Sequence, residues 1–306
     1  MKGSFMQSRK IIRNIFYLYI LVAGILWGTI GLFFNQLSAL GLDRFQVMLL
    51  RIGVAAVCLG LYIAVTNRQL FKIDLRDLWM FLGTGICSLM FFNYCYFTCI
   101  AMVSVSVAAV LLYTAPMMVM VMSILLFHEK FTVKKGIVVL MTFFGCVFVT
   151  GVNGNGNIGL TGILVGLASG FGYALYSIFS TYALKKYHSI TITFYTFVLA
   201  ALGTLPLSHV PELMPMLSNP QVLLYGAGLG IFACMFPYLL YTRGLTGVVA
   251  SHASVMATVE PVVATLIGVL VFNEGMTLGK LCGIILILAG IVVLNVQFPG
   301  EKTQSE

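Results

Sequence analysis

The chain of 306 residues is 60% hydrophobic and only 8% charged, and its mean hydropathy is +1.04. A soluble domain is closer to about half apolar and a quarter charged, so the composition excludes a soluble protein and indicates one whose solvent is lipid. The net charge of +8 is spread singly or in small groups between apolar runs. Because nucleic-acid binding needs a dense basic patch, we expect no nucleic-acid partner.

Ten apolar runs follow one another, each near the length that crosses about 30 Å of hydrocarbon as a helix. The first run follows basic residues, as a signal peptide does, but it lacks a small-residue cleavage site and should remain in the membrane. The sequence therefore predicts an all-α integral membrane protein with ten transmembrane helices, near Tyr17–Phe34, Phe45–Val65, Leu78–Phe97, Val103–Phe127, Gly136–Val152, Gly159–Leu184, Ile190–Leu207, Val222–Tyr241, Val248–Phe272 and Thr277–Val296. Turn-like stretches at 67–77, 153–157 and 211–220 separate some of them.

The basic residues predict the orientation of these helices. With the N-terminus in the cytoplasm, Arg44 and Lys280 lie outside and Arg51 lies within the second run, while the other 14 of the 17 basic residues fall on cytoplasmic segments. Cytoplasmic loops carry an excess of lysine and arginine. We therefore expect both termini in the cytoplasm, and a plasma-membrane location because nothing in the sequence indicates an organelle.

The two halves of the chain resemble each other. A shift of 145 residues places Pro116 on Pro261 and Glu129 on Glu274, within the segments YTAPMMVMVMSILLFHEKF and ATVEPVVATLIGVLVFNEGM. The sequence thus divides into two five-helix repeats, at residues 1–152 and 153–306. Because five is odd, the second repeat must enter the membrane from the opposite side, which makes an inverted repeat of the kind used for alternating access.

Several segments resemble the ten-helix EamA-type family of the drug/metabolite transporter superfamily. They include LWGTIGLF and LRIGVAAVCL in the first half and ASGFGYALYSIFSTYALKK in the second, besides the paired proline segments. The resemblance covers most of both halves. It implies secondary transport or export of a small metabolite through a central cavity between the halves, without naming the substrate.

Glu260 and Pro261 lie together near the middle of the ninth run. A carboxylate at the bilayer midplane is costly unless it is neutral, paired or facing water, and a proline frees a backbone carbonyl and kinks the helix. Interrupted helices of this kind line transporter sites. We interpret Glu260 as a proton-coupling group or the partner of a cationic substrate group, facing the cavity without a fixed basic partner. The alternative is a protonated glutamate hydrogen-bonded to a neighbouring helix.

Arg51, Glu129 and Glu274 are the other charged candidates, assigned with Pro116 to structural or gating roles. The stem of Arg51 can snorkel to the outer face, or the residue is buried and holds an anionic substrate group or backbone carbonyls. Glu129 and Glu274 occupy equivalent positions at opposite membrane faces. They either form a gate that breaks and re-forms, or cap the next helix or pair with a lysine such as Lys130, Lys134 or Lys280.

Polar-tipped side chains recur within the runs, and such groups usually need hydrogen-bond partners when they are deep in a bundle. Near the ends of the runs they belong instead to the interfacial aromatic belt. The set comprises Trp27, Asn93, Tyr94, Tyr113, Tyr173, Tyr176, Tyr238 and Tyr241. We expect some of these side chains to line a cavity for an aromatic or amphipathic solute, together with Glu260 and Pro261. They are Trp27, Asn93, Tyr113, Tyr176 and Tyr238.

The seven cysteines and four histidines show no metal-ligand spacing, and no Walker sequence is present. We expect a small-molecule substrate, lipid as the surrounding partner, and neither metal nor cofactor; the sequence carries no indication of the oligomeric state. The favoured function is a secondary-active exporter rather than an enzyme. The alternatives are a passive channel or facilitator, which needs a constant open path, and a membrane-embedded enzyme, which needs clustered catalytic groups.

Overall fold

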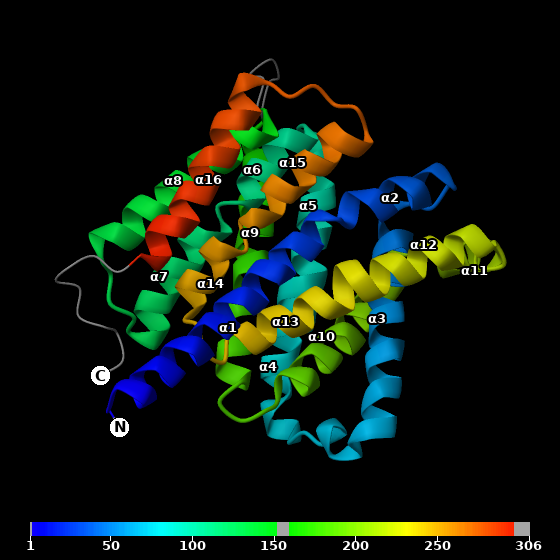
Figure 1. The fold of residues 1–306 in the computed structure, drawn as a ribbon. Coiled ribbons are helices and arrows are strands. Elements are labelled where there is room, and N and C mark those ends of the chain that lie inside the picture. The colour runs from blue at the N-terminus through cyan, green and yellow to red at the C-terminus, as the bar shows by residue number, and fades with distance from the viewer. Residues whose placement is uncertain (1, 152–158, 297–306) are drawn as a thin grey trace.

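The computed structural model describes residues 2–151 and 159–296 (Figure 1). Within them ten helical segments are long and apolar enough to cross a membrane, so the predicted ten-helix membrane fold is confirmed. The first five segments are built from α1 (Lys2–Gly28), α2 (Ile30–Ala39), α3 (Arg44–Thr66), α4 (Leu78–Leu82), the π-helical η3 (Gly83–Met90), α5 (Phe91–Met102), α6 (Val105–Leu112), α7 (Ala115–Phe127) and α8 (Val133–Thr150). The second five are built from α9 (Leu160–Ala183), α10 (Ser189–Thr204), η4 (Leu205–Leu207), α12 (Pro220–Gly230), the π-helical η5 (Ile231–Met235), α13 (Phe236–Gly244), α14 (Ala250–Met256), α15 (Val259–Val271) and α16 (Leu278–Asn295).

The two halves interrupt their helices at corresponding places. The fourth segment breaks between α6 and α7, and the ninth breaks between α14 and α15. The third and eighth segments each contain a π-helical stretch, η3 and η5, a feature that is frequent at functional sites. The correspondence is not complete, because the first segment breaks after Gly28 whereas its counterpart α9 is continuous.

The helices of the two halves interleave. α1 packs against α13, α14 and α15 of the second half, while its counterpart α9 packs against η3, α5, α6 and α7 of the first. α3 packs against α10, and α8 lies beside α16, as Figure 1 shows. The main cluster of buried apolar side chains draws on both halves, so the two halves share one core.

Glycines at the crossing of α8 and α16 reveal the relative direction of these counterparts. A Cβ built on Gly145 would lie 2.6 Å from Cγ1 of Ile287, and one built on Gly290 would lie 2.9 Å from Cγ2 of Thr142. The contacting residue number falls along α16 as it rises along α8, so the helices run antiparallel. Such small residues allow close helix approach in lipid, and antiparallel counterparts are the relation expected of an inverted repeat.

Two connections contain more structure than the sequence indicated. The turn-like stretch 211–220 overlaps α11 (Val210–Met216), which carries Pro211 in its first turn, where a missing N–H costs no helical hydrogen bond. The charged stretch 67–77 forms two 3₁₀ helices, η1 (Arg68–Phe71) and η2 (Leu75–Asp77). The predicted turn at 153–157 lies outside the described residues.

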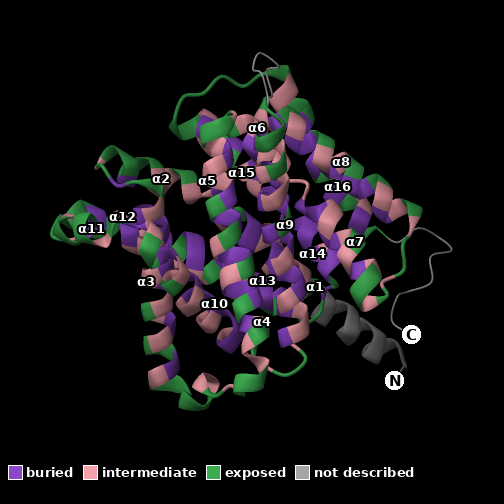
Figure 2. Cartoon of the chain, turned by 180° about the vertical axis from the view of Figure 1, so that it is seen from behind, coloured by how far each residue is buried: buried purple, intermediate pink, exposed green. Residues whose placement is uncertain are grey.

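The outer surface of the bundle carries many large apolar side chains. On α3, for example, Leu61 is 63% exposed and Val65 is 86% exposed. Figure 2 shows exposed positions on the outward faces of the helices and buried positions toward the middle of the bundle. Apolar side chains exposed on this scale fit a protein whose surface contacts lipid.

Candidate functional site

The candidate site begins at the break in the ninth segment. α14 ends at Met256 and α15 begins at Val259, so Glu260 and Pro261 lie in the first turn of α15. A proline is tolerated there because the first turn has no helical acceptor for its N–H. At the end of α14 the carbonyl of Val255 accepts two hydrogen bonds from Thr258, one from its hydroxyl at 2.6 Å and one from its amide at 3.1 Å. The kink expected at Pro261 is therefore a break in the helix just before it.

Aromatic rings from both halves surround a cavity close to this break. The Trp27 ring, from α1, lies 5.1 Å from Tyr238 and 5.4 Å from Tyr241 between ring centroids. These tilted and edge-to-face arrangements are the ones that aromatic pairs favour. The cavity is lined by Trp27, Phe92, Tyr173, Tyr176, Ser177, Tyr238 and Tyr241.

Hydrogen bonds hold two of the lining tyrosines in place. The hydroxyl of Tyr176 pairs with that of Thr242 at 2.6 Å, and Tyr241 pairs with Ser177 at 2.7 Å. Within the described residues the hydroxyl of Tyr238 has no hydrogen-bond partner, although the side chain is only 5% exposed. The cavity thus has aromatic walls that hydrogen bonds hold in place, and the hydroxyl of Tyr238 is available to bind a ligand.

Glu260 lies beside the cavity rather than in its lining. Its Oε2 accepts a long hydrogen bond of 3.5 Å from the hydroxyl of Tyr173, which does line the cavity. In the described part of the chain no lysine or arginine lies within ion-pair distance of it. Arg51 nevertheless interacts with the carboxylate at longer range.

Arg51 is the second charged group near the cavity. Its side chain comes from α3, is 9% exposed, and has an Nε without a hydrogen-bond partner. α3 packs against η5, which runs into α13 and its lining residues Tyr238 and Tyr241. The low exposure of the side chain places Arg51 inside the bundle, and the structure favours the buried interpretation over snorkelling.

The other predicted site residues lie outside the cavity lining. The amide of Asn93 donates to the carbonyl of Leu89 at 2.7 Å and is buried within its own helix. Tyr113 stands at the break between α6 and α7, and Pro116 is buried in the first turn of α7. Phe92 and Ser177 line the cavity but were not predicted, because nothing in their neighbouring sequence distinguishes them from packing residues.

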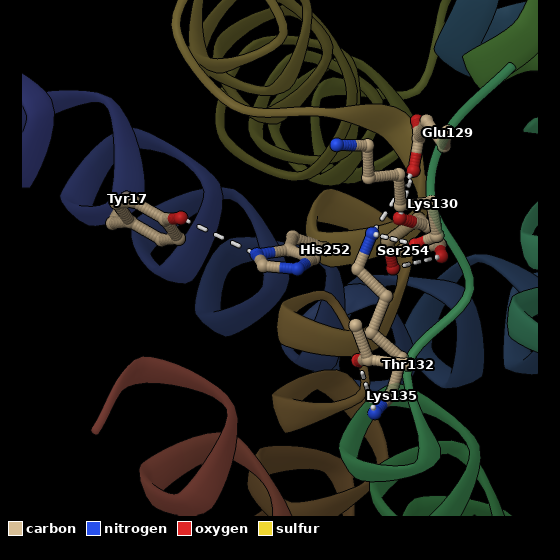
Figure 3. Close-up of polar contacts among 8 residues, drawn as sticks. Tyr17, Glu129, Lys130, Thr132, Lys135, His252 and Ser254 are labelled. Carbon is tan, nitrogen blue, oxygen red and sulfur yellow. Dashed lines mark hydrogen bonds and ion pairs between the residues drawn. The ribbon is translucent and has the colours of Figure 1, made fainter. Parts of the chain in front are cut away.

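A polar cluster that we call the first corner, Glu129, Lys135 and Ser251, joins the halves at one end of the bundle. Lys135 lies 3.5 Å from Oε2 of Glu129, and their side chains are only 7% and 10% exposed. Ser251 of α14 donates a short hydrogen bond to the same oxygen. Figure 3 shows this ion pair beside a second link, in which Tyr17 of α1 and His252 of α14 are 3.3 Å apart. The lysine partner of Glu129 is thus Lys135, rather than Lys130 or Lys134.

The second corner consists of the corresponding residues Glu274, Lys280 and Ser106. Lys280 lies 2.9 Å from Oε2 of Glu274, as predicted, but the glutamate side chain is 54% exposed. No hydrogen bond joins Ser106 to Glu274 among the described residues. Because α8 and α16 run antiparallel and each corner directly precedes one of these helices, the two corners lie at opposite ends of the bundle.

A further link between the halves lies in the connections at the first corner's end. Lys186 forms an ion pair with Asp77, to which Tyr187 also donates. This hydrogen-bonded pairing with Asp77 raises the pKa of Lys186 above its usual 10.5. Burial, followed by the charge of Arg243, lowers the pKa of nearby His188.

The described residues contain no group of three histidine, cysteine or acidic side chains that could hold a metal ion. All seven cysteines are free. The polar groups near the cavity are therefore the ones available for recognition, and they comprise an acid, a guanidinium and tyrosine hydroxyls.

Comparison with known proteins decides the family. The sequence profile of the EamA-like transporter family matches residues 14–151 and again residues 160–296. The chain belongs to the EamA-like transporter family. An uncharacterized transporter of Archaeoglobus fulgidus is 29% identical over 279 residues, covering 90% of this chain and 94% of that protein. The uncharacterized transporter YwfM of Bacillus subtilis is 25% identical over 295 residues, covering 95% and 97%.

A solved crystal structure shares the fold of this chain. It superposes with a TM-score of 0.76 at 18% sequence identity, covering 92% of this chain and 96% of the other. At this identity the likeness supports the fold alone. The family and the ten apolar segments make the chain a multi-pass membrane transporter, as predicted.

Proposed function

We propose that the chain is a secondary-active transporter that exports a small organic solute across the plasma membrane by alternating access. The two repeats, 1–152 and 153–306, form the two moving parts, and both chain termini lie in the cytoplasm. On this topology the first corner is cytoplasmic and the second is extracellular. The positive charges of the cytoplasmic loops support the orientation.

The observation that carries the proposal is the difference between the two corners. Corresponding glutamates precede corresponding helices, yet Glu129 is sealed against Ser251 and Glu274 is exposed. An inverted repeat can exchange the conformations of its halves, so that each state is the mirror of the other. The first corner is then the closed gate of this state, and the second corner is the gate that stands open.

The opposite state follows from the same correspondence. A shift of 145 residues relates Glu129 to Glu274 and Ser106 to Ser251. When the extracellular side closes, Glu274 should receive a hydrogen bond from Ser106, while the bond between Glu129 and Ser251 is lost. The transition breaks one charge-assisted hydrogen bond at one gate and forms the corresponding bond at the other, so the two states can be similar in free energy.

Glu260 supplies the proposed coupling to protons. It is one turn or less from a helix break, contacts the cavity through Tyr173, and lacks an ion-pair partner among the described residues. A carboxylate in this setting can take up a proton on one side of the membrane and release it on the other as the gates alternate.

The direct test is solute counterflow in sealed proteoliposomes. Vesicles preloaded with one unlabelled solute, from a panel of amino acids, nucleosides, amines, sugars and organic acids, should transiently accumulate the same labelled solute above its external concentration. A carrier shows this overshoot, whereas an open channel only equilibrates the label.

The matched variant is Glu260→Gln, which preserves shape and removes titration. It should retain counterflow but lose uptake driven by a pH gradient. Saturable counterflow in neither protein with any solute of the panel would contradict the transporter mechanism. Undiminished pH-driven uptake by the glutamine variant would contradict the role of Glu260 alone.

A further inference from the structure

Among the described residues, Arg51 is a buried charge without a hydrogen-bond or ion-pair partner. Its side chain is nine-tenths buried, its Nε has no hydrogen-bond partner, and none of the hydrogen bonds or ion pairs among the described residues involves its guanidinium. A buried charge that is left uncompensated is costly, and a guanidinium offers a planar fork of donors suited to carboxylate. The guanidinium of Arg51 is therefore available to bind an anion.

The packing of α3 places Arg51 beside a helix that lines the cavity. α3 packs directly against η5, which runs into α13, and α13 carries the lining residues Tyr238 and Tyr241. A Cβ built on Gly230, which directly precedes η5, would lie 3.0 Å from the carbonyl of Arg51. Only a glycine-sized residue lets α3 approach so closely.

We propose that Arg51 is the anion-binding residue of the cavity, and that the transported solute is an organic carboxylate with an apolar body. The carboxylate of the solute pairs with the guanidinium of Arg51 and accepts a hydrogen bond from the hydroxyl of Tyr238. The apolar body of the solute packs on Trp27. This inference rests on the proposed function, since it names the class of substrate that the same cavity takes.

The position of Glu260 makes binding of such an anion depend on pH. An ionised Glu260 and the carboxylate of the solute compete for the positive charge of Arg51. Protonation of Glu260 therefore strengthens binding of the anion. The other titratable groups that face Glu260 come from α5, the α6–α7 break, α8, α9 and α13, and they are Tyr96, Tyr113, Cys146, Tyr173 and Tyr238. Tyrosines and a buried thiol stay neutral near pH 7, which leaves Glu260 as the group that titrates. Among the described residues of α1, α2 and α16, which also contact α15, no titratable group interacts with it.

The test is equilibrium binding to the purified full chain in lipid nanodiscs. Three probes share one apolar body and differ in charge: 3-phenylpropionate, the neutral 3-phenylpropionamide and the cationic 3-phenylpropylamine. We expect the carboxylate to bind best, and to bind more tightly at pH 6 than at pH 8. Arg51→Gln should weaken its binding about tenfold or more, while Arg51→Lys, which keeps the charge but not the fork, should fall between.

A second readout separates recognition from a structural role. Because Arg51 has no hydrogen-bond or ion-pair partner among the described residues, Arg51→Gln should fold with an unfolding midpoint no lower than that of the parent. Glu260→Gln should bind the carboxylate equally at both pH values. Equal binding of the acid and the amide, parent-like binding of the acid by Arg51→Gln, or loss of the folded state in both Arg51 variants would overturn the proposal. Carboxylate binding without counterflow would instead count against the transport mechanism, and counterflow of neutral solutes without carboxylate binding would count against this inference.

Discussion

The two corners of the transporter have almost the same local structure but different surroundings. His128 and Asn273, which end α7 and follow α15, both have a left-handed φ of 54°. Thr132 and Thr277 cap the next helices by accepting from the amides of Lys135 and Lys280, at 3.3 and 3.2 Å. Each glutamate amide bonds the last turn of the preceding helix, at 3.2 and 3.0 Å. The local sequence therefore builds the same corner twice.

The difference between the corners lies in what the other half of the molecule does. At the first corner α14 approaches and Ser251 covers Glu129, whereas at the second corner Glu274 is exposed to the surroundings. In the second corner the carboxylate instead lies over its own helix, where a Cβ built on Gly268 would be 2.9 Å from Oε2. The counterpart of Gly268 is Ser123, which is fully buried. The two corners therefore differ in how their helices pack and not in how their helices form.

The largest effect should follow removal of the lysine of the first corner. Lys135→Ala leaves the buried Glu129 without its partner and should lower the free energy of unfolding by about 3 kcal/mol. Lys280→Ala, at the exposed second corner, should lower it by less than about 1 kcal/mol. Unfolding in detergent titrations of both variants measures the contrast. Equal losses at the two corners would show that burial does not distinguish them.

A smaller effect should follow loss of the serine that closes the first corner. Ser251→Ala removes a hydrogen bond to a charged group, worth about 1.5–3 kcal/mol, and should shift the protein toward the opposite state. Ser106→Ala should not destabilise the present state, because its hydroxyl has no partner there among the described residues. Labelling of a single cysteine at Lys130, in a background without the native cysteines, reports opening of the first corner. Unchanged labelling in Ser251→Ala would remove this serine from the gate.

The neighbouring link between α1 and α14 should contribute less. Tyr17→Phe deletes a hydroxyl that lies 3.3 Å from His252, and a neutral hydrogen bond contributes about 0.5–1.5 kcal/mol. We expect faster labelling at Lys130 than in the parent and slower labelling than in Ser251→Ala. An effect larger than that of Ser251→Ala would make the tyrosine, and not the serine, the main closure.

The smallest effect concerns the exposed ion pair of Lys186 and Asp77. The pairing raises the pKa of Lys186 above 10.5, so its contribution to stability is fully present below pH 10.5 and is lost as the pH rises through the raised value. Asp77→Asn should therefore lower the unfolding midpoint slightly at pH 8 and leave it unchanged well above pH 11. A constant difference at all these pH values would mean that the aspartate acts by packing rather than by charge.

The sequence predicted the number of segments and the pairing of Glu274 with Lys280, because apolar length and contacts between near neighbours are local properties. It did not predict which lysine pairs with Glu129. Lys130 and Lys134 are nearer in sequence, but Lys135 lies on the buried side of α8. It also gave no sign that Ser177 or Phe92 lines the cavity, since membership of a wall depends on how helices from two halves cross.

We propose that the two corners close in turn, and spin-label distances measure this alternation most directly. One pair of labels, at Lys130 and Val249, spans the first corner. A second pair, at Gly275 and Val105, spans the second corner. Val105 is labelled in place of Ser104, the counterpart of Val249, because Ser104 caps α6. In the parent the first distance should be short and the second long, and in Ser251→Ala the two should exchange. A variant in which the first distance lengthens while the second stays unchanged would contradict alternating access.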